Sequence, residues 1–117
     1  MTFKQDYLFN KLTYWKNYNR NSMAEREFDT LTYLLAVFCG YELKKGSSVL
    51  DLGSGDQFLK NEFNKREISY FSLDIKDLNF ETDKFTFDDN KFDLVISLAV
   101  LEHLKNPDIF LNESKRV

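Results

Sequence analysis

The stretch VLDLGSGDQFL, residues 49–59, joins a short apolar run to two of the chain's four glycines, Gly53 and Gly55. The apolar run predicts a buried strand at 48–52, and the residues after the glycines predict a helix at 56–66. A glycine turn between a strand and a helix lets the backbone approach a ligand, with the free N–H groups of the helix directed at it. We therefore expect ligand binding at this turn. The alternative is that the glycines only make the turn tight.

Two further segments complete a predicted parallel sheet. The alternating, aromatic stretch SYFSLDI predicts a second strand at 69–74, and a strand, a helix and a strand of these lengths form a βαβ unit with parallel pairing. The run KFDLVIS is too continuously apolar for a half-exposed strand and predicts a third strand at 92–97, covered on both faces. A last helix is expected at 107–116, with Pro107 in its first turn.

The residues before the first strand predict a helix at 22–44. Its start is marked by Ser22 and Glu25, which match a capping pattern. Its buried stripe is expected to consist of four apolar residues at helical spacing: Phe28, Leu31, Leu35 and Phe38. We expect residues 1–21 to form an amino-terminal arm or a short helix, separate from a domain over 22–117. One more short strand is expected near 79–82.

Composition narrows the classes of partner. The 117 residues carry a net charge of -3, which gives no electrostatic basis for binding nucleic acid or an acidic membrane surface. No apolar run approaches the roughly 18 residues that a membrane helix needs, and no residues have metal-ligand spacing. The one cysteine, Cys39, has no disulfide partner and is expected to be buried, which favours a reducing, cytoplasmic location.

An acidic residue strengthens the ligand-binding interpretation. Asp74 ends the second predicted strand about 20 residues after the glycines, where a carboxylate can accept hydrogen bonds from the hydroxyls of a ribose. The third glycine of the nicotinamide-cofactor fingerprint is replaced by Phe58. Asp51, two residues before Gly53, would repel a pyrophosphate but attract an ammonium group. A ligand with both a ribose and an amine fits this pattern.

These segments, together with FTFDDNKFDLVISLAVLEHLKNPDIFLNESKRV at the end of the chain, resemble the class I S-adenosylmethionine-dependent methyltransferases. The resemblance begins near residue 47. It implies an α/β fold, a Rossmann-like three-layer sandwich with a mainly parallel sheet, and methyl transfer from S-adenosylmethionine to a small or medium acceptor, with S-adenosylhomocysteine as product.

The resemblance also implies roles for individual residues. Gly53, Ser54 and Gly55 would line the methionine end of the cofactor, and Asp51 would hold its amino group. Asp74 would bind the ribose hydroxyls. Ile75 would lie against the adenine face. Ser97 and Leu98 would approach the sulfonium through their backbone. Methyl transfer requires no metal.

The chain departs from the family pattern in three places. Gln57 stands where relatives usually have a third alternating glycine, so we expect a tighter loop. The segment after Asp74 is short, and it leaves the contact to the adenine amine open among Asp77, Glu81 and Asp83. Relatives continue beyond NESKRV into further strands, so we expect a chain truncated at its carboxyl end that lacks the last strands of the fold and self-associates through an open sheet edge.

A catalytic base is not assigned by the sequence. His103 is a weak candidate, since histidine can accept a proton near neutral pH, but it can equally pack beside the site. The alternative functions are a non-catalytic S-adenosylmethionine-binding or scaffold domain, a nicotinamide-dependent oxidoreductase, and a structural fragment that binds nothing.

Overall fold

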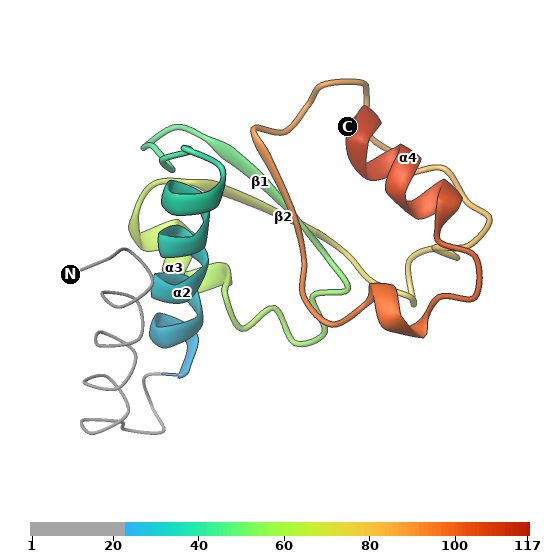
Figure 1. Cartoon of the computed structure of the whole chain (residues 1–117), viewed down its shortest axis with the longest axis horizontal. Helices are drawn as coiled ribbons and strands as arrows, with labels where there is room; N and C mark the ends of the chain where they lie inside the picture. The colour runs from blue at the N-terminus through green and yellow to red at the C-terminus, as the bar shows by residue number, and fades with distance from the viewer. Residues whose placement is uncertain (1–22) are drawn as a thin grey trace. The chain divides into compact units, whose positions relative to one another are not determined.

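The structure is a computed structural model that describes residues 23–117 (Figure 1). The chain divides into two compact units, residues 1–42 and 43–117. The predicted boundary at residue 21 falls outside the described residues and stays a prediction, as does the capping role of Ser22.

Within the first unit, helix α2 spans Met23–Phe38 and ends six residues before the predicted position. Gly40 stops it, because its φ of 59° is left-handed and the N–H of Tyr41 turns back to the Leu35 carbonyl at 3.0 Å. The expected stripe is only partly buried: Phe28 is buried, whereas Phe38 is 77% exposed. Cys39, expected to be buried, is exposed as well.

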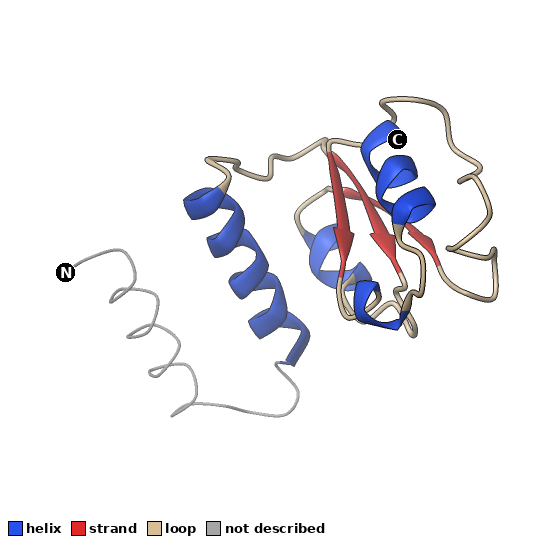
Figure 2. Cartoon of the chain, turned by 45° about the vertical axis from the view of Figure 1, so that its right-hand side comes forward, coloured by secondary structure: helices blue, strands red, loops and turns tan. Residues whose placement is uncertain are grey.

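The second unit is built on a parallel sheet whose strands are β1 (Ser48–Leu52), β2 (Ser69–Leu73) and β3 (Leu94–Ser97). Their order is β2-β1-β3, and all three strands run in the same direction (Figure 2). The three-stranded parallel sheet and its βαβ unit are as predicted, although no strand forms near 79–82. Within residues 23–117, β3 is an edge strand, and no described strand pairs with its second side. Self-association through that edge stays a prediction.

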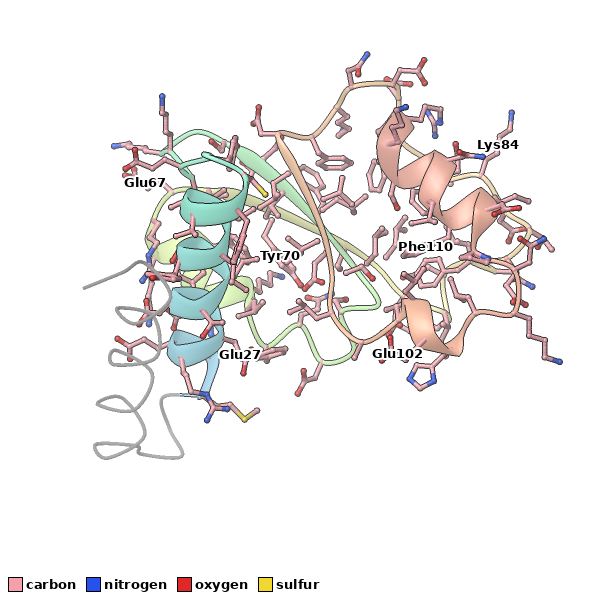
Figure 3. The ribbon with its side chains drawn as sticks, in the orientation of Figure 1. Glu27, Glu67, Tyr70, Lys84, Glu102 and Phe110 are labelled. Carbon is pink, nitrogen blue, oxygen red and sulfur yellow. The ribbon has the colours of Figure 1, made fainter. Side chains whose placement is uncertain are left out.

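Two helices cover opposite faces of the sheet (Figures 1 and 2). On one face, α3 (Lys60–Lys65) places Phe63 against Tyr70 of β2, with ring centroids 5.7 Å apart. On the other face, α4 (Asp108–Arg116) contributes Phe110 to a core with Leu50 and Leu52 of β1. Figure 3 shows Tyr70 on the α3 side and Phe110 on the α4 side. The alternation of β1 side chains between two apolar faces explains why nearly the whole strand is buried.

Arg116, at the end of α4, anchors the segment that precedes β3. Its guanidinium donates to the carbonyls of Phe85 and Phe87 at 3.0 and 2.9 Å and to the Asp89 carboxylate at 2.7 Å. The buried carboxylate of Glu113 accepts from Arg116 Nε at 2.6 Å and from the Phe85 N–H at 2.8 Å. These bonds hold residues 85–89 against α4.

Among residues 23–117, no helix combines the length and apolarity needed to cross a membrane.

Candidate functional site

The carboxyl ends of all three strands meet at one edge of the sheet. Leu52, at the end of the central strand, pairs with Leu73 on one side and with Ser97 on the other. The chain passes from β1 to β2 on one side and then crosses to β3 on the other, so the strand order reverses beside β1. In open parallel sheets, ligands bind outside the carboxyl ends of the strands at such a reversal. The predicted site residues that follow the three strands therefore lie around one candidate site.

The two glycines of the loop have different surroundings. Gly53 has a φ of 72°, and a Cβ built on it would lie 2.1 Å from Val100 Cγ2. Its N–H donates to the Leu73 carbonyl at 2.7 Å. Gly55 also has a positive φ, 56°, but no atom lies within 4 Å of its hypothetical Cβ. Gly53 is thus required for close packing within the protein, whereas Gly55 borders open space.

Gln57 has a backbone conformation that ordinarily favours glycine. Its φ is 59°, in the left-handed region that favours glycine, and its side-chain Nε2 donates to Ser72 Oγ of β2 at 2.8 Å. A left-handed residue interrupts a right-handed helix, so α3 starts at Lys60 instead of the predicted residue 56. The loop is therefore attached to β2 by a side chain that glycine would lack.

Asp51 is a buried carboxylate, 3% exposed, and the phenol of Tyr70 donates to its Oδ2 at 2.5 Å. Burial raises the pKa of Asp51 above its ordinary value; the Tyr70 hydrogen bond opposes this effect, and the nearby carboxylate of Asp74 adds to it. Burial and the Asp51 hydrogen bond also raise the pKa of the Tyr70 phenol, which therefore remains a donor. Ser54, also buried, contacts the same phenol.

Asp74, predicted as the last residue of the second strand, directly follows β2, which ends at Leu73. Its Oδ1 accepts from the Ile75 N–H at 2.8 Å, and its own N–H donates to Asp77 Oδ2 at 2.8 Å. The three candidates for the adenine contact all accept backbone hydrogen bonds. Asp77 binds the Asp74 N–H, Asp83 binds the Asn79 N–H, and Glu81 binds the N–H groups of Lys105 and Asn106. Each of these carboxylates therefore has a local structural role, and the choice among them stays open.

Apolar side chains are exposed at the same edge. Ile75 is 76% exposed and Leu98 39% exposed. Leu101 belongs to the short 3-10 helix η2 (Leu101–His103) and is 46% exposed. Exposed aliphatic side chains next to two carboxylates provide both apolar and charged contacts for a ligand. Ser97, the last residue of β3, is also exposed.

His103 lies at the surface of η2, beside the labelled Glu102 of Figure 3. Its side chain is 76% exposed, and its Nε2 lies 3.7 Å from Glu102 Oε1. A proton acceptor in this position is open to solvent, so its catalytic role stays a weak prediction.

Three residues that shape the site were not predicted from the sequence. Tyr70 is the partner of Asp51, Val100 packs on Gly53, and Ala99 has a left-handed φ of 61° between the exposed Leu98 and the buried Val100. No local pattern in the sequence marks any of the three. Within the described part of the chain, no group of three His, Cys, Asp or Glu side chains could hold a metal ion.

Comparison with known proteins agrees with this geometry. A family model described as a methyltransferase domain matches residues 14–116, and the chain therefore belongs to the methyltransferase domain family. The predicted resemblance to methyltransferases is thereby confirmed, and the solved structure described next confirms the predicted Rossmann-like fold. A solved SAM dependent methyltransferase from Aquifex aeolicus has the same fold, with a TM-score of 0.56 and 24% sequence identity. The match covers 79% of this chain and 65% of that chain. No curated protein matches the sequence.

Proposed function

We propose that this domain binds S-adenosylmethionine at the carboxyl edge of the sheet and serves in methyl transfer to a small or medium-sized acceptor. The observation that carries the proposal is the pair of carboxylates, Asp51 and Asp74, at the point where the strand order reverses. Asp51 lies one residue before the end of β1, and Asp74 directly follows the neighbouring strand β2. The two carboxylates are close enough for the charge of Asp74 to raise the pKa of Asp51.

The charge of this pair favours a cationic ligand. Two carboxylates near one another disfavour their own ionisation, and a positive charge between them removes that penalty. S-adenosylmethionine carries an ammonium and a sulfonium. A dinucleotide carries a pyrophosphate, which the same carboxylates would repel. The site therefore favours S-adenosylmethionine over a nicotinamide cofactor.

The residues at the edge fit the cofactor. The open space at Gly55 can admit the methionine end, the Asp51 carboxylate suits its ammonium, and the Asp74 carboxylate suits the ribose hydroxyls. The exposed side chain of Ile75 offers an apolar contact for adenine, while the backbone of Ser97 and Leu98 borders the sulfonium end. When bound, S-adenosylmethionine supplies an electrophilic methyl group. The task of the protein residues is then to bind, to align acceptor and donor, and to exclude water.

Replacing Asp74 tests the ribose contact. Asp74→Ala should weaken S-adenosylmethionine binding by about 1.5–3 kcal/mol, the range for hydrogen bonds to a charged acceptor. Asp74→Asn should be intermediate, because an amide oxygen can still accept from the Ile75 N–H. Isothermal titration calorimetry measures both, with the exposed Asp88→Ala as the control. If Asp74→Ala binds as tightly as the parent chain, the ribose assignment is wrong.

A glycine pair separates binding from stability. Gly55→Ala and Gly46→Ala both place a Cβ in open space at a positive φ, so each should destabilise the fold by about 1–2 kcal/mol. Gly55→Ala alone should also weaken cofactor binding at least about tenfold, since its methyl group would occupy space that the ligand needs. Calorimetry and urea unfolding on both variants check this. Equal cofactor affinities would show that Gly55 only shapes the turn.

The function as a whole is tested by calorimetry of the unmodified chain with S-adenosylmethionine and, separately, with a nicotinamide dinucleotide. We expect binding of the first and not of the second. The reverse preference would overturn the proposal. Tight binding of S-adenosylmethionine without transfer of a labelled methyl group to any of a panel of sugars, lipids, quinones and amines would instead favour the non-catalytic, scaffold alternative.

A further inference from the structure

Tyr70 reaches the candidate site from the neighbouring strand. It pairs in register with Val49, while Asp51 pairs with Ser72, so Tyr70 and Asp51 are diagonal neighbours on the α3 face of the sheet. The Tyr70 ring stacks on Phe63 of α3 with an interplanar angle of 29°. This packing fixes the ring and directs its hydroxyl at Asp51 Oδ2, 2.5 Å away (Figure 3 labels Tyr70).

The hydrogen bond uses one of the two oxygens of Asp51. Among residues 23–117, Tyr70 is the one side chain that donates to this carboxylate. In the same part of the chain, no fully buried polar side-chain atom lacks a partner. Because no residue of 23–117 donates to Oδ1 of Asp51, this oxygen belongs to the small fraction of Asp51 that is exposed. One oxygen is thus held by the protein, and the other is accessible.

We propose that Tyr70 is a positioning residue that fixes the Asp51 carboxylate, so that its free oxygen, Oδ1, accepts the ammonium group of the cofactor. The inference rests on the proposed function, because it assigns Asp51 to that ammonium. It goes further, because it gives Tyr70 an indirect role in cofactor affinity: Tyr70 acts through Asp51 and does not contact the ligand itself.

The electrostatics around Asp51 make the phenol important. The Asp74 carboxylate at the end of β2 and burial within the sheet both disfavour the ionised form of Asp51. Ser54 and the charge of Asp56, in the loop after β1, act on the Tyr70 phenol itself. The Tyr70 O–H is the group that stabilises the ionised carboxylate. Removing it should raise the pKa of Asp51, so the carboxylate would lose its charge at a higher pH and cofactor binding would weaken there.

The test compares the full chain with Tyr70→Phe, which keeps the ring that stacks on Phe63. Carbon-13 NMR titration of the carboxyl groups, without cofactor, should show the Asp51 midpoint rising by about one pH unit. Calorimetry should show S-adenosylmethionine affinity falling about fivefold to tenfold at pH 7. The pH below which affinity is lost should move upward by the same amount as the NMR midpoint. Tyr41→Phe, in the other compact unit, should change none of these values.

A second variant shows whether Tyr70 acts through Asp51. In an Asp51→Asn background, Tyr70→Phe should have no further effect on affinity, because no carboxylate remains to be positioned. A lower melting temperature with an unchanged Asp51 midpoint and unchanged affinity would make Tyr70 merely structural and overturn this inference alone. Failure of the unmodified chain to bind S-adenosylmethionine would instead overturn the proposed function, and with it the cofactor part of the inference.

Discussion

Gly53→Ala should destabilise the second unit by about 2–5 kcal/mol. The new Cβ would lie 2.1 Å from Val100 Cγ2, a distance that requires one of the two residues to move. Val100 cannot yield easily, since it is buried and its branched side chain is restricted at χ1. The φ of 72° adds the cost of a left-handed alanine, about 1–2 kcal/mol. Urea unfolding of the purified variant measures the loss.

Two further variants divide this cost into its parts. Gly46→Ala gives the backbone contribution to the loss of stability alone. The φ of Gly46 is 88°, and no atom lies within 4 Å of the new Cβ. In a Val100→Ala background, the nearest remaining atom of residue 100 is its Cβ, 3.5 Å from the new Cβ of residue 53, which is an ordinary contact. In that background, Gly53→Ala should therefore lower the free energy of unfolding by no more than Gly46→Ala does. An equal cost of Gly53→Ala in both backgrounds would show that close packing is not the reason for the glycine.

Glu113→Ala should cost about 2–3 kcal/mol of stability. The substitution removes the carboxylate that accepts from the Phe85 N–H and from two Arg116 nitrogens. The expected loss lies below the roughly 3–5 kcal/mol for breaking a fully buried ion pair, because the Arg116 side chain is 29% exposed. Glu113→Gln should lose less, since its amide oxygen can still accept from Phe85. Asp89→Ala is the control. Asp89 is 72% exposed and accepts from one Arg116 nitrogen, so its loss should be small. Chemical unfolding compares the three, and a similar loss in all would contradict a special role for Glu113.

The same carboxylate predicts how stability depends on pH. Hydrogen bonds from Arg116 lower the pKa of Glu113 below its ordinary value of 4.5, so the folded state binds a proton less readily than the unfolded chain. Its contribution is complete above about pH 4.5 and is lost as pH falls through the lower value of the folded state. Thermal unfolding between pH 3 and 7 should therefore show a shallower acid loss in Glu113→Gln than in the parent chain. Parallel curves would contradict this assignment.

Local patterns were sufficient to predict the three strands: apolar runs for β1 and β3, and aromatic alternation for the partly exposed β2. The spacing from the glycines to Asp74 then predicted the edge of the sheet at which we propose that the ligand binds, since parallel strands place their carboxyl ends together. These features depend on patterns within a few residues, which a single sequence contains.

The features that were missed depend on contacts between distant segments. Nothing near Tyr70 in the sequence indicates Asp51, which lies 19 residues earlier, and nothing near Arg116 indicates Phe85 or Phe87. The late start of α3 has a different origin: Gln57 is an ordinary helix residue by propensity, and its side-chain bond to Ser72 accompanies a left-handed backbone.

The alternation of exposure after β3 has a practical consequence for engineering. Leu98, Ala99 and Leu101 have exposed side chains, whereas Val100 between them is buried against Gly53. A library that randomises positions 98, 99 and 101 and leaves Val100 unchanged would vary the surface at the proposed ligand-binding edge while preserving the contact between Val100 and Gly53. Selection for altered ligand range could therefore begin from a segment of four residues, with the sheet and both of its covering helices left as they are.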